Sequence, residues 1–160
     1  MPANGDLIFR QMRTTPYPDA ETNDFILVDG PLPALRHVRA LTEHFGFGVA
    51  KQLAKTLSKD RLFYITLSDG AVVNIGSLAI GFCNFYTVEP DAVVIGSVWT
   101  ADAFRGKGLA TRSIRSAVNS MITRNRHTFY IDTQAGNTAM LRSIEKLGFG
   151  RPVGTFTSRN

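Results

Sequence analysis

The chain has 160 residues, which is enough for one domain with a sizeable buried core. Apolar residues make up 44% and charged residues 19%, a composition that argues against a disordered or membrane-embedded protein. No stretch reaches the roughly 20 apolar residues of a membrane span, and the first residues lack a signal-peptide pattern. We therefore expect one cytoplasmic domain over residues 1–160, with residues 1–30 as an irregular N-terminal segment.

The net charge of +5 favours an anionic partner. Arginines and lysines are spread along the chain without a run of five, so we do not expect nucleic acid to be that partner. The single cysteine, Cys83, excludes an internal disulfide and a cysteine-rich zinc site, and we expect no bound metal. Because Cys83 lies in an apolar run, we expect it to be a buried, inert thiol.

The first half of the chain predicts two short strands followed by two helices. "LIFRQMR" (7–13) and "FILV" (25–28) are each expected as a short edge strand. Leu35, Val38, Leu41 and Phe45 recur at helical spacing, and two glycines then separate this helix from a second amphipathic one over residues 49–57.

Strand signals follow. "RLFYITLS" (61–68) and "VVNIGSLAIGFCNFYTV" (72–88) are joined by an Asp-Gly hairpin turn, and the second, long strand is expected to bend at Gly76 or Gly81. "EPDA" (89–92) predicts a turn, and "VVIGSVWT" (93–100) predicts another apolar strand. Three strands joined in this way indicate an antiparallel meander.

The pattern then alternates between helix and strand. A helix is predicted from residue 110 to 121, a strand over "HTFYIDT" (127–133), a helix over 137–149 and a last short strand over "VGTFTS" (153–158). Asn137 is the expected cap of the second helix and Gly148 its end. A strand–helix–strand crossover pairs its strands in parallel, so the fold class is α+β (mixed α/β) with a mixed sheet.

"FRGKGLATR" (104–112) places two glycines where the strand 93–100 leads into a helix. It lacks the spacing of a P-loop and the third glycine of a dinucleotide fingerprint. Glycines allow close approach to the backbone, and a helix start offers unpaired N–H groups. The stretch therefore indicates a phosphate site, although a turn that only caps the helix would have the same sequence.

"VWTADAFRGKGLATRSI" (98–114) resembles the signature of the GNAT superfamily of acyl-CoA-dependent N-acyltransferases, with Arg105, Gly108 and Ala110 at the signature positions. A second family motif, an Asn-led helix that ends in Leu-Gly-Phe, falls on Asn137 to Phe149. The order of elements also agrees. The resemblance implies a GNAT-like fold whose strand 93–100 splays from strand 127–133, with helices on both faces of the sheet.

The resemblance also implies acetyl-CoA or another acyl-CoA as the donor and an amine as the acceptor. Strand-end residues would pair with the pantetheine, and the glycine loop and the Asn-led helix would hold the phosphates. The expected cofactor-binding residues are Val98, Trp99, Thr100, Arg105, Gly106, Lys107, Gly108, Leu109, Ala110, Thr111, Asn137 and Arg142. Of these, Trp99 is expected mainly as a core residue.

Direct transfer requires a group that removes a proton from the acceptor ammonium. The expected catalytic residues are Glu89, Asp91 and Tyr130. Many family members place an acidic tyrosine where this chain has Ile144, which cannot donate a proton, while the adjacent Ser143 is expected to point elsewhere. Further titratable candidates near the cleft are Asp132, His127, and His44 with Glu43.

After Phe149 only one strand is expected, where most family members have a hairpin that covers the acceptor site. The site is therefore open, covered by the N-terminal segment, or completed by a second subunit, and a homodimer is one prediction. The leading hypothesis is an N-acetyltransferase. The alternatives are a catalytically reduced GNAT-like module that binds acyl-CoA and a nucleic-acid binder that uses the basic face.

Overall fold

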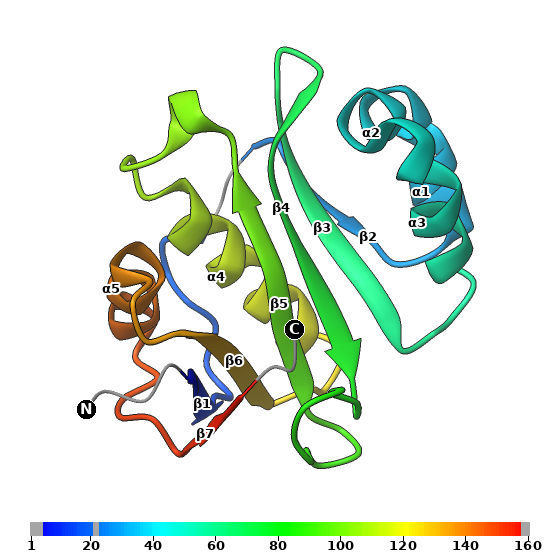
Figure 1. The fold of residues 1–160 in the computed structure, drawn as a ribbon. Coiled ribbons are helices and arrows are strands. Elements are labelled where there is room, and N and C mark those ends of the chain that lie inside the picture. Colours follow the sequence, from blue (N-terminus) through cyan, green and yellow to red (C-terminus); the bar gives the residue numbers. More distant parts are fainter. Residues whose placement is uncertain (1–4, 21–22, 158–160) are drawn as a thin grey trace.

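The computed structural model describes residues 5–20 and 23–157. Within these residues the strands form one sheet in the order β2-β3-β4-β5-β6-β1-β7 (Figure 1). The strands are β1 (Asp6–Met12), β2 (Phe25–Val28), β3 (Arg61–Ser68), β4 (Ala71–Ile80), β5 (Val93–Thr100), β6 (Thr128–Gln134) and β7 (Gly154–Phe156). Only β5 and β6 pair in parallel, and the other neighbours are antiparallel. The predicted mixed sheet with an antiparallel meander is confirmed.

Helices cover both faces of the sheet (Figure 1). The α-helices are α1 (Pro31–Arg36), α2 (Val38–Phe45), α3 (Val49–Lys55), α4 (Leu109–Ile122) and α5 (Thr138–Leu147), with short 3-10 helices η1 (Gly46–Gly48) and η2 (Asp102–Phe104). Along β3, Leu62 and Tyr64 enter the core under α4 and α5, whereas Phe63 and Ile65 enter the core under α1 and α2. This alternation follows from the two-residue period of a strand. None of the described helices is long and apolar enough to cross a membrane.

The first helix predicted from residues 35–45 is in fact two helices that meet at His37. The His37 backbone N–H donates to Ala34 O at 3.3 Å, which ends α1, and Leu41 N–H donates to His37 O at 3.0 Å, which opens α2. The glycine-containing turn and the helix after it are as predicted.

The long strand predicted over residues 72–88 is wrong in its second half. β4 ends at Ile80, and residues 81–92 form a loop over the end of the sheet. Gly81 has φ +70°, and a Cβ there would lie 2.5 Å from Pro90 O. Glycine is needed at this position because the backbone is left-handed and closely packed, and periodicity does not reveal such a turn. Cys83 lies in this loop, partly exposed, rather than in a strand.

β1 is not an edge strand, as the sequence suggested, because it lies between β6 and β7. It pairs with β6 from Asp6↔Gln134 to Met12↔Thr128. Both of its faces are buried: Phe9 belongs to the core under α4 and α5, and Ile8 packs with Val94 and Tyr130 on the opposite face. The N-terminal segment therefore completes the sheet beside the short β7. β2 is an edge strand, as predicted. Residues 1–4 and 21–22 of that segment, and Ser158 of the predicted last strand, lie outside the described residues.

Candidate active site

The site is built on the separation of β5 from β6. The two strands pair from Val93↔Phe129 to Ile95↔Ile131, and no pairing is found beyond that point in the described chain. On its other side, β5 carries a bulge: Ser77 of β4 pairs with Gly96, and Ile75 pairs with Trp99, so β5 has one residue more than β4. Ser97 in the bulge has φ 50°. A bulge leaves a residue unpaired in the ladder and re-aims the strand, here where β5 leaves β6.

Asn74 holds the end of β5 in place. Its fully buried side chain donates from Nδ2 to Trp99 O and to Thr100 Oγ1, both at 2.9 Å. Sequence reasoning did not identify Asn74, because this role depends on the register between β4 and β5.

The glycine loop that follows β5 and η2 has the backbone that its sequence predicts. Gly106 and Gly108 both have φ +73°, and Gly108 is the N-cap of α4. The N–H of Arg112 donates to Gly108 O at 3.1 Å and opens the helical ladder. The N–H groups of the first turn before it have no partner within the helix and mark its positive end.

A cavity of about 550 Å³ opens beside this loop. Its walls come from the end of β5, η2, the loop, the first turn of α4 and one side of α5. The lining residues are Val98, Trp99, Thr100, Phe104, Arg105, Gly106, Gly108, Leu109, Ala110, Thr111, Asn137, Ala139, Met140, Arg142, Ser143 and Lys146. Every predicted cofactor-binding residue except Lys107 is in this wall. Lys107 is not in the wall itself, but its Nζ lies 5.8 Å from the ring centroid of Phe104, which is.

The cavity wall is rich in positive charge. Arg105, Arg142 and Lys146 all contribute to it. Arg105 is oriented by an ion pair with Asp102 at 2.9 Å and by donation from Nε to Thr100 O at 3.0 Å. Together with the start of α4, these cations make the cavity suited to an anion such as a pyrophosphate.

The α5 wall confirms the predicted caps and changes the expectation for one side chain. Asn137 Oδ1 accepts from Met140 N–H at 3.2 Å, and Gly148 ends the helix with φ +80°. Ser143, expected to point elsewhere, lines the cavity, and its hydroxyl lies 3.1 Å from that of Thr111 on α4. Ile144 is 1% exposed in the core.

Trp99 also differs from the expectation of a core residue. It is 37% exposed, lines the cavity, and its ring centroid lies 4.6 Å from that of His44 on α2. Desolvation lowers the pKa of His44, so its imidazole is mainly neutral at pH 7. The last turn of α2 therefore borders the opening beside β5.

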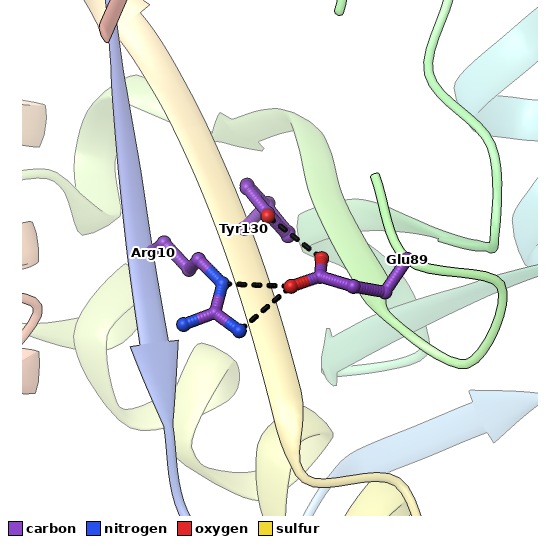
Figure 2. Close-up of polar contacts among 3 residues, drawn as sticks. All are labelled: Arg10, Glu89 and Tyr130. Carbon is purple, nitrogen blue, oxygen red and sulfur yellow. Dashed lines mark hydrogen bonds and ion pairs between the residues drawn. The ribbon is translucent and has the colours of Figure 1, made fainter. Parts of the chain in front are cut away.

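Two of the three predicted catalytic residues meet on the face of the sheet opposite α4. Tyr130 Oη donates to Glu89 Oε2 at 2.7 Å, and Arg10 donates to Glu89 Oε1 from Nη2 at 2.7 Å and from Nε at 3.0 Å (Figure 2). The Tyr130 hydrogen bond, together with Arg10, lowers the pKa of Glu89. Burial and the same hydrogen bond raise the pKa of Tyr130. Glu89 is therefore a stable anion beside a neutral phenol.

Asp91 is exposed on the turn after Glu89 and has no side-chain hydrogen bond among the described residues. The Glu89–Tyr130 pair lies level with Val94, the partner of Tyr130 in β5. Val98 is four residues further along β5, a distance of about 13 Å at the usual rise of a strand. The structure thus brings Glu89 and Tyr130 together, but at a distance from the strand end that lines the cavity.

A second carboxylate lies nearer to the splay. Asp132 follows Ile131, the last β6 residue paired with β5, and Tyr86 Oη donates to its Oδ2 at 2.8 Å. Burial raises the pKa of Asp132. His127, by contrast, lies before β6 with its ring nitrogens close to Arg13 O and Asn125 Oδ1. No group of three or more His, Cys, Asp or Glu side chains in residues 5–20 and 23–157 is arranged to hold a metal.

Sequence reasoning missed several residues of this region. Arg10 and Tyr86 come from segments far from the motifs, and only the sheet order and the loop 81–92 bring them to the site. Helical periodicity could have indicated Ala139, Met140, Ser143 and Lys146, because they share the face of α5 that Asn137 begins.

Comparisons with known proteins agree with this geometry. The family model described as the acetyltransferase (GNAT) family matches residues 51–149. A GNAT-family protein of known structure from Novosphingobium aromaticivorans is 19% identical with a TM-score of 0.60, and the match covers 97% of this chain but only 66% of that one. No curated protein matches the chain.

Two similar structures are aminoglycoside acetyltransferases. AAC(6')-Iy, solved in complex with CoA, is 18% identical with a TM-score of 0.64, covering 86% of this chain and 98% of that one. An aminoglycoside acetyltransferase from an uncultured soil metagenomic sample is 16% identical with a TM-score of 0.64, covering 86% and 97%. At these identities the similarity shows a shared fold.

Proposed function

Because the chain belongs to the GNAT acetyltransferase family, we propose that it is an N-acetyltransferase that moves an acetyl group from acetyl-CoA to a primary amine. The observation that carries this proposal is the basic cavity of about 550 Å³ between the splayed end of β5, the glycine loop and α5. Its place and lining suit a donor with a pyrophosphate and a narrow, amide-containing arm.

In this proposal the pyrophosphate binds the N–H groups at the start of α4. Gly106, Gly108 and Ala110 keep bulky side chains away from that backbone, while Arg105 and Arg142 neutralise phosphate charge. The pantetheine arm runs along Val98–Thr100 and takes up strand-like hydrogen bonds where β6 has left β5. The thioester carbonyl is then polarised by a backbone N–H of the bulge near Val98.

The amine attacks this carbonyl directly, and the thiolate of CoA leaves. Glu89, Asp91 and Tyr130 remain the catalytic candidates from the sequence. Since the pKa of Glu89 is lowered, its carboxylate stays ionised, and its ion pair with Arg10 offsets most of that charge; we assign it the role of a hydrogen-bond acceptor on the acceptor face. Tyr130 holds that carboxylate in place (Figure 2). Asp91 stands at the solvent end of the same turn and adds negative charge.

We propose a cationic amine as the acceptor class. The acceptor would approach from the face of the sheet opposite α4, where Asp132 supplies negative charge beside the Glu89–Arg10 ion pair, and Tyr86 and Phe85 supply aromatic surface. The similar structures include enzymes that carry the name aminoglycoside acetyltransferase. Aminoglycosides are therefore the first acceptors to test, followed by polyamines, amino acids and peptide amines.

The direct test is release of CoA, followed with a thiol reagent, from acetyl-CoA and a panel of these amines. Mass spectrometry of the amine then identifies the product. We expect at least one amine to gain an acetyl group at a rate above that of the amine-free reaction. Binding of acetyl-CoA with no transfer to any amine would contradict the enzymatic proposal.

One observation favours a second candidate function. Ile144 occupies the position of the expected acidic tyrosine and is 1% exposed, so no proton donor reaches the thiolate from that helix position. A catalytically reduced module that binds acyl-CoA without turnover would have this residue. The amine panel separates the two cases, because a module of this kind binds acetyl-CoA without transfer to any amine.

A further inference from the structure

Asp132 combines three features, of which Glu89 shares the partial burial and the phenol hydrogen bond but not the place at the splay. Asp132 lies at the point where β5 and β6 separate, it is partly buried, and it is oriented by a hydrogen bond from a neutral phenol. Catalytic bases are commonly held by a third group in this way.

Along the strands, Asp132 lies nearer than Glu89 to the end of β5. Ile131 pairs with Ile95, so Asp132 is level with Gly96, the β5 residue at the edge of the bulge. Val98 is two residues further, about 7 Å along the strand, whereas Glu89 and Tyr130 lie level with Val94 at about 13 Å. Measured along the strands, an amine that contacts Asp132 is therefore closer to a carbonyl near Val98 than one that contacts Glu89.

The side chain of Asp132 points to the face of the sheet opposite the donor cavity. Side chains of alternate β6 residues point to the same face, so Asp132 shares its face with Tyr130, away from the core residues Phe129 and Ile131. The donor cavity lies between α4, α5 and the end of β5. Asp132 therefore faces the acceptor side of the split sheet while the donor enters from the other side.

The groups around Asp132 set the pKa of its carboxyl. Asp132 is surrounded by Tyr86 from the loop 81–92, by Asp6 from β1, and by Tyr130 with the Glu89–Arg10 ion pair from the neighbouring positions. Cys83 lies beside Tyr86. Burial first, and then the negative charge of Asp6, raise the pKa of Asp132, while the Tyr86 hydrogen bond opposes them. A carboxylate with a raised pKa accepts a proton from an ammonium more readily than Glu89 does.

On this geometry, and resting on the proposed N-acetyltransferase function, we propose that Asp132 is the general base that receives the proton of the acceptor ammonium and that Tyr86 is its positioning residue. The ammonium proton moves to an Asp132 carboxylate oxygen. The freed lone pair forms the N–C bond, and the C–S bond breaks with its electron pair on sulfur. The second amine proton passes to the thiolate, and Asp132 releases its proton to solvent.

His44 is the rival base, because its neutral imidazole stands beside Trp99 at the same opening. No hydrogen bond orients its ring within the described residues. A carboxylate, moreover, attracts the ammonium before it takes the proton, whereas a neutral imidazole does not. These differences favour Asp132.

The test compares the variants D132N, E89Q and H44Q with the wild-type chain. D60N is the matched control, because it removes an exposed charge on the turn before β3. The readout is kcat/KM for the best amine of the panel above, together with the dissociation constant of acetyl-CoA. We expect D132N to lower kcat/KM by about 100-fold or more with unchanged acetyl-CoA affinity. D60N should stay within about twofold, since exposed sites carry little coupling.

The Y86F variant tests Tyr86 through the pH profile of kcat/KM, which a purely structural role of Tyr86 would not shift. Removing the Tyr86 hydrogen bond raises the pKa of Asp132 further, so the acidic limb of the kcat/KM profile should move to higher pH. In wild type, kcat/KM falls as the pH drops through the raised pKa of Asp132, because the base becomes protonated. Thermal unfolding curves establish that each variant is folded, and D132E serves as a second variant should D132N not fold.

The outcomes are separable. D132N activity within threefold of wild type, loss of activity in H44Q alone, or an unmoved pH profile in Y86F would overturn the assignment. Acetyl-CoA binding without acetylation of any amine would overturn the proposed enzymatic function on which the assignment rests. Failure of the wild-type chain to bind acetyl-CoA would instead overturn the proposed function itself.

Discussion

Glu89 and Asp132 show how the surroundings of a carboxylate set its proton affinity on one face of this sheet. Glu89 accepts from Tyr130 and from Arg10, which stabilise its charged form. Asp132 accepts from Tyr86 alone, is more buried and lies near Asp6, and its pKa is raised, chiefly by burial. The same residue class thus supplies a fixed charge at one position and a proton acceptor at the next.

Replacing Tyr130 with Phe should raise the pKa of Glu89 towards its ordinary value, because the hydrogen bond from Tyr130 is the first cause of its lowered pKa. A carboxyl whose folded pKa is lowered stabilises the fold above its unfolded pKa of about 4.3. That contribution is lost as the pH falls through the lowered folded value. Carboxyl NMR titration measures the shift, and an unchanged Glu89 pKa in Y130F would contradict the assignment.

Gly108 should matter more for donor binding than Lys107. Gly108 caps α4 in a left-handed conformation inside the cavity wall, whereas Lys107 lies outside it. Aspartate at position 108 would place a negative charge at the anion site and lower acetyl-CoA affinity by at least about tenfold. Trp99 is the only tryptophan of the chain and lines the same cavity, so its fluorescence reports the titration. K107A is the matched comparison, with an expected loss of less than about threefold, and equal losses in the two variants would refute this ranking.

Among the strands, β1 has a position that the sequence did not predict, because it lies inside the sheet between β6 and β7. β1 pairs with β6 along its whole length and with β7 through Asp6, Leu7 and Ile8. It also delivers Arg10 to the Glu89–Tyr130 pair (Figure 2). An element from the start of the chain therefore stabilises both the last strand and the acceptor face.

Phe9 gives a quantitative test of this role, since it is buried under α4 and α5. Phe9→Ala should lower the free energy of unfolding by about 3–5 kcal/mol, the range for a large buried aromatic. Phe47 in η1 is fully exposed, and Phe47→Ala should change stability by less than about 0.5 kcal/mol. Urea denaturation measures both. If the two variants unfold alike, β1 does not belong to the cooperative fold.

Local signals in the sequence were enough to predict most elements and the backbone of the glycine loop. Gly108, Asn137 and Gly148 act on their own helix ends, so their residue types predict their roles. The meander and the parallel crossover follow from strand periodicity and connection length. The strand 93–100 could be placed beside the glycine loop because the two are consecutive in the chain.

Contacts between distant segments could not be predicted in the same way. The insertion of β1 between β6 and β7 depends on pairing across more than a hundred residues. The turn at Gly81 depends on a close approach to Pro90, and the Asp132–Tyr86 hydrogen bond depends on that turn. Asp132 was one candidate among several in the sequence, and only the register of β6 places it at the splay.

For the molecule as a whole, the basic charge has a defined location. Part of the net charge of +5 lies in the cavity wall through Arg105, Arg142 and Lys146. On the other face of the sheet, Asp132 and the aromatic groups lie beside the Glu89–Arg10 ion pair. This polarity suits an anionic donor on one side and a cationic acceptor on the other.

The homodimer expected from the short C-terminus stays a prediction. β1 and β7 complete the sheet within one chain, so the acceptor face does not depend on a second subunit for its strands. Sedimentation velocity at the concentration used for activity measures the assembly state. A purely monomeric species that is fully active would contradict the dimer.

Calorimetric titration of the wild-type protein with acetyl-CoA tests the assignment most directly, because every proposed step requires a bound donor. We predict saturable binding at one site per chain, weakened by G108D through the loop that begins α4. Absence of binding at high micromolar acetyl-CoA would contradict the central claim that this cavity is an acyl-CoA site.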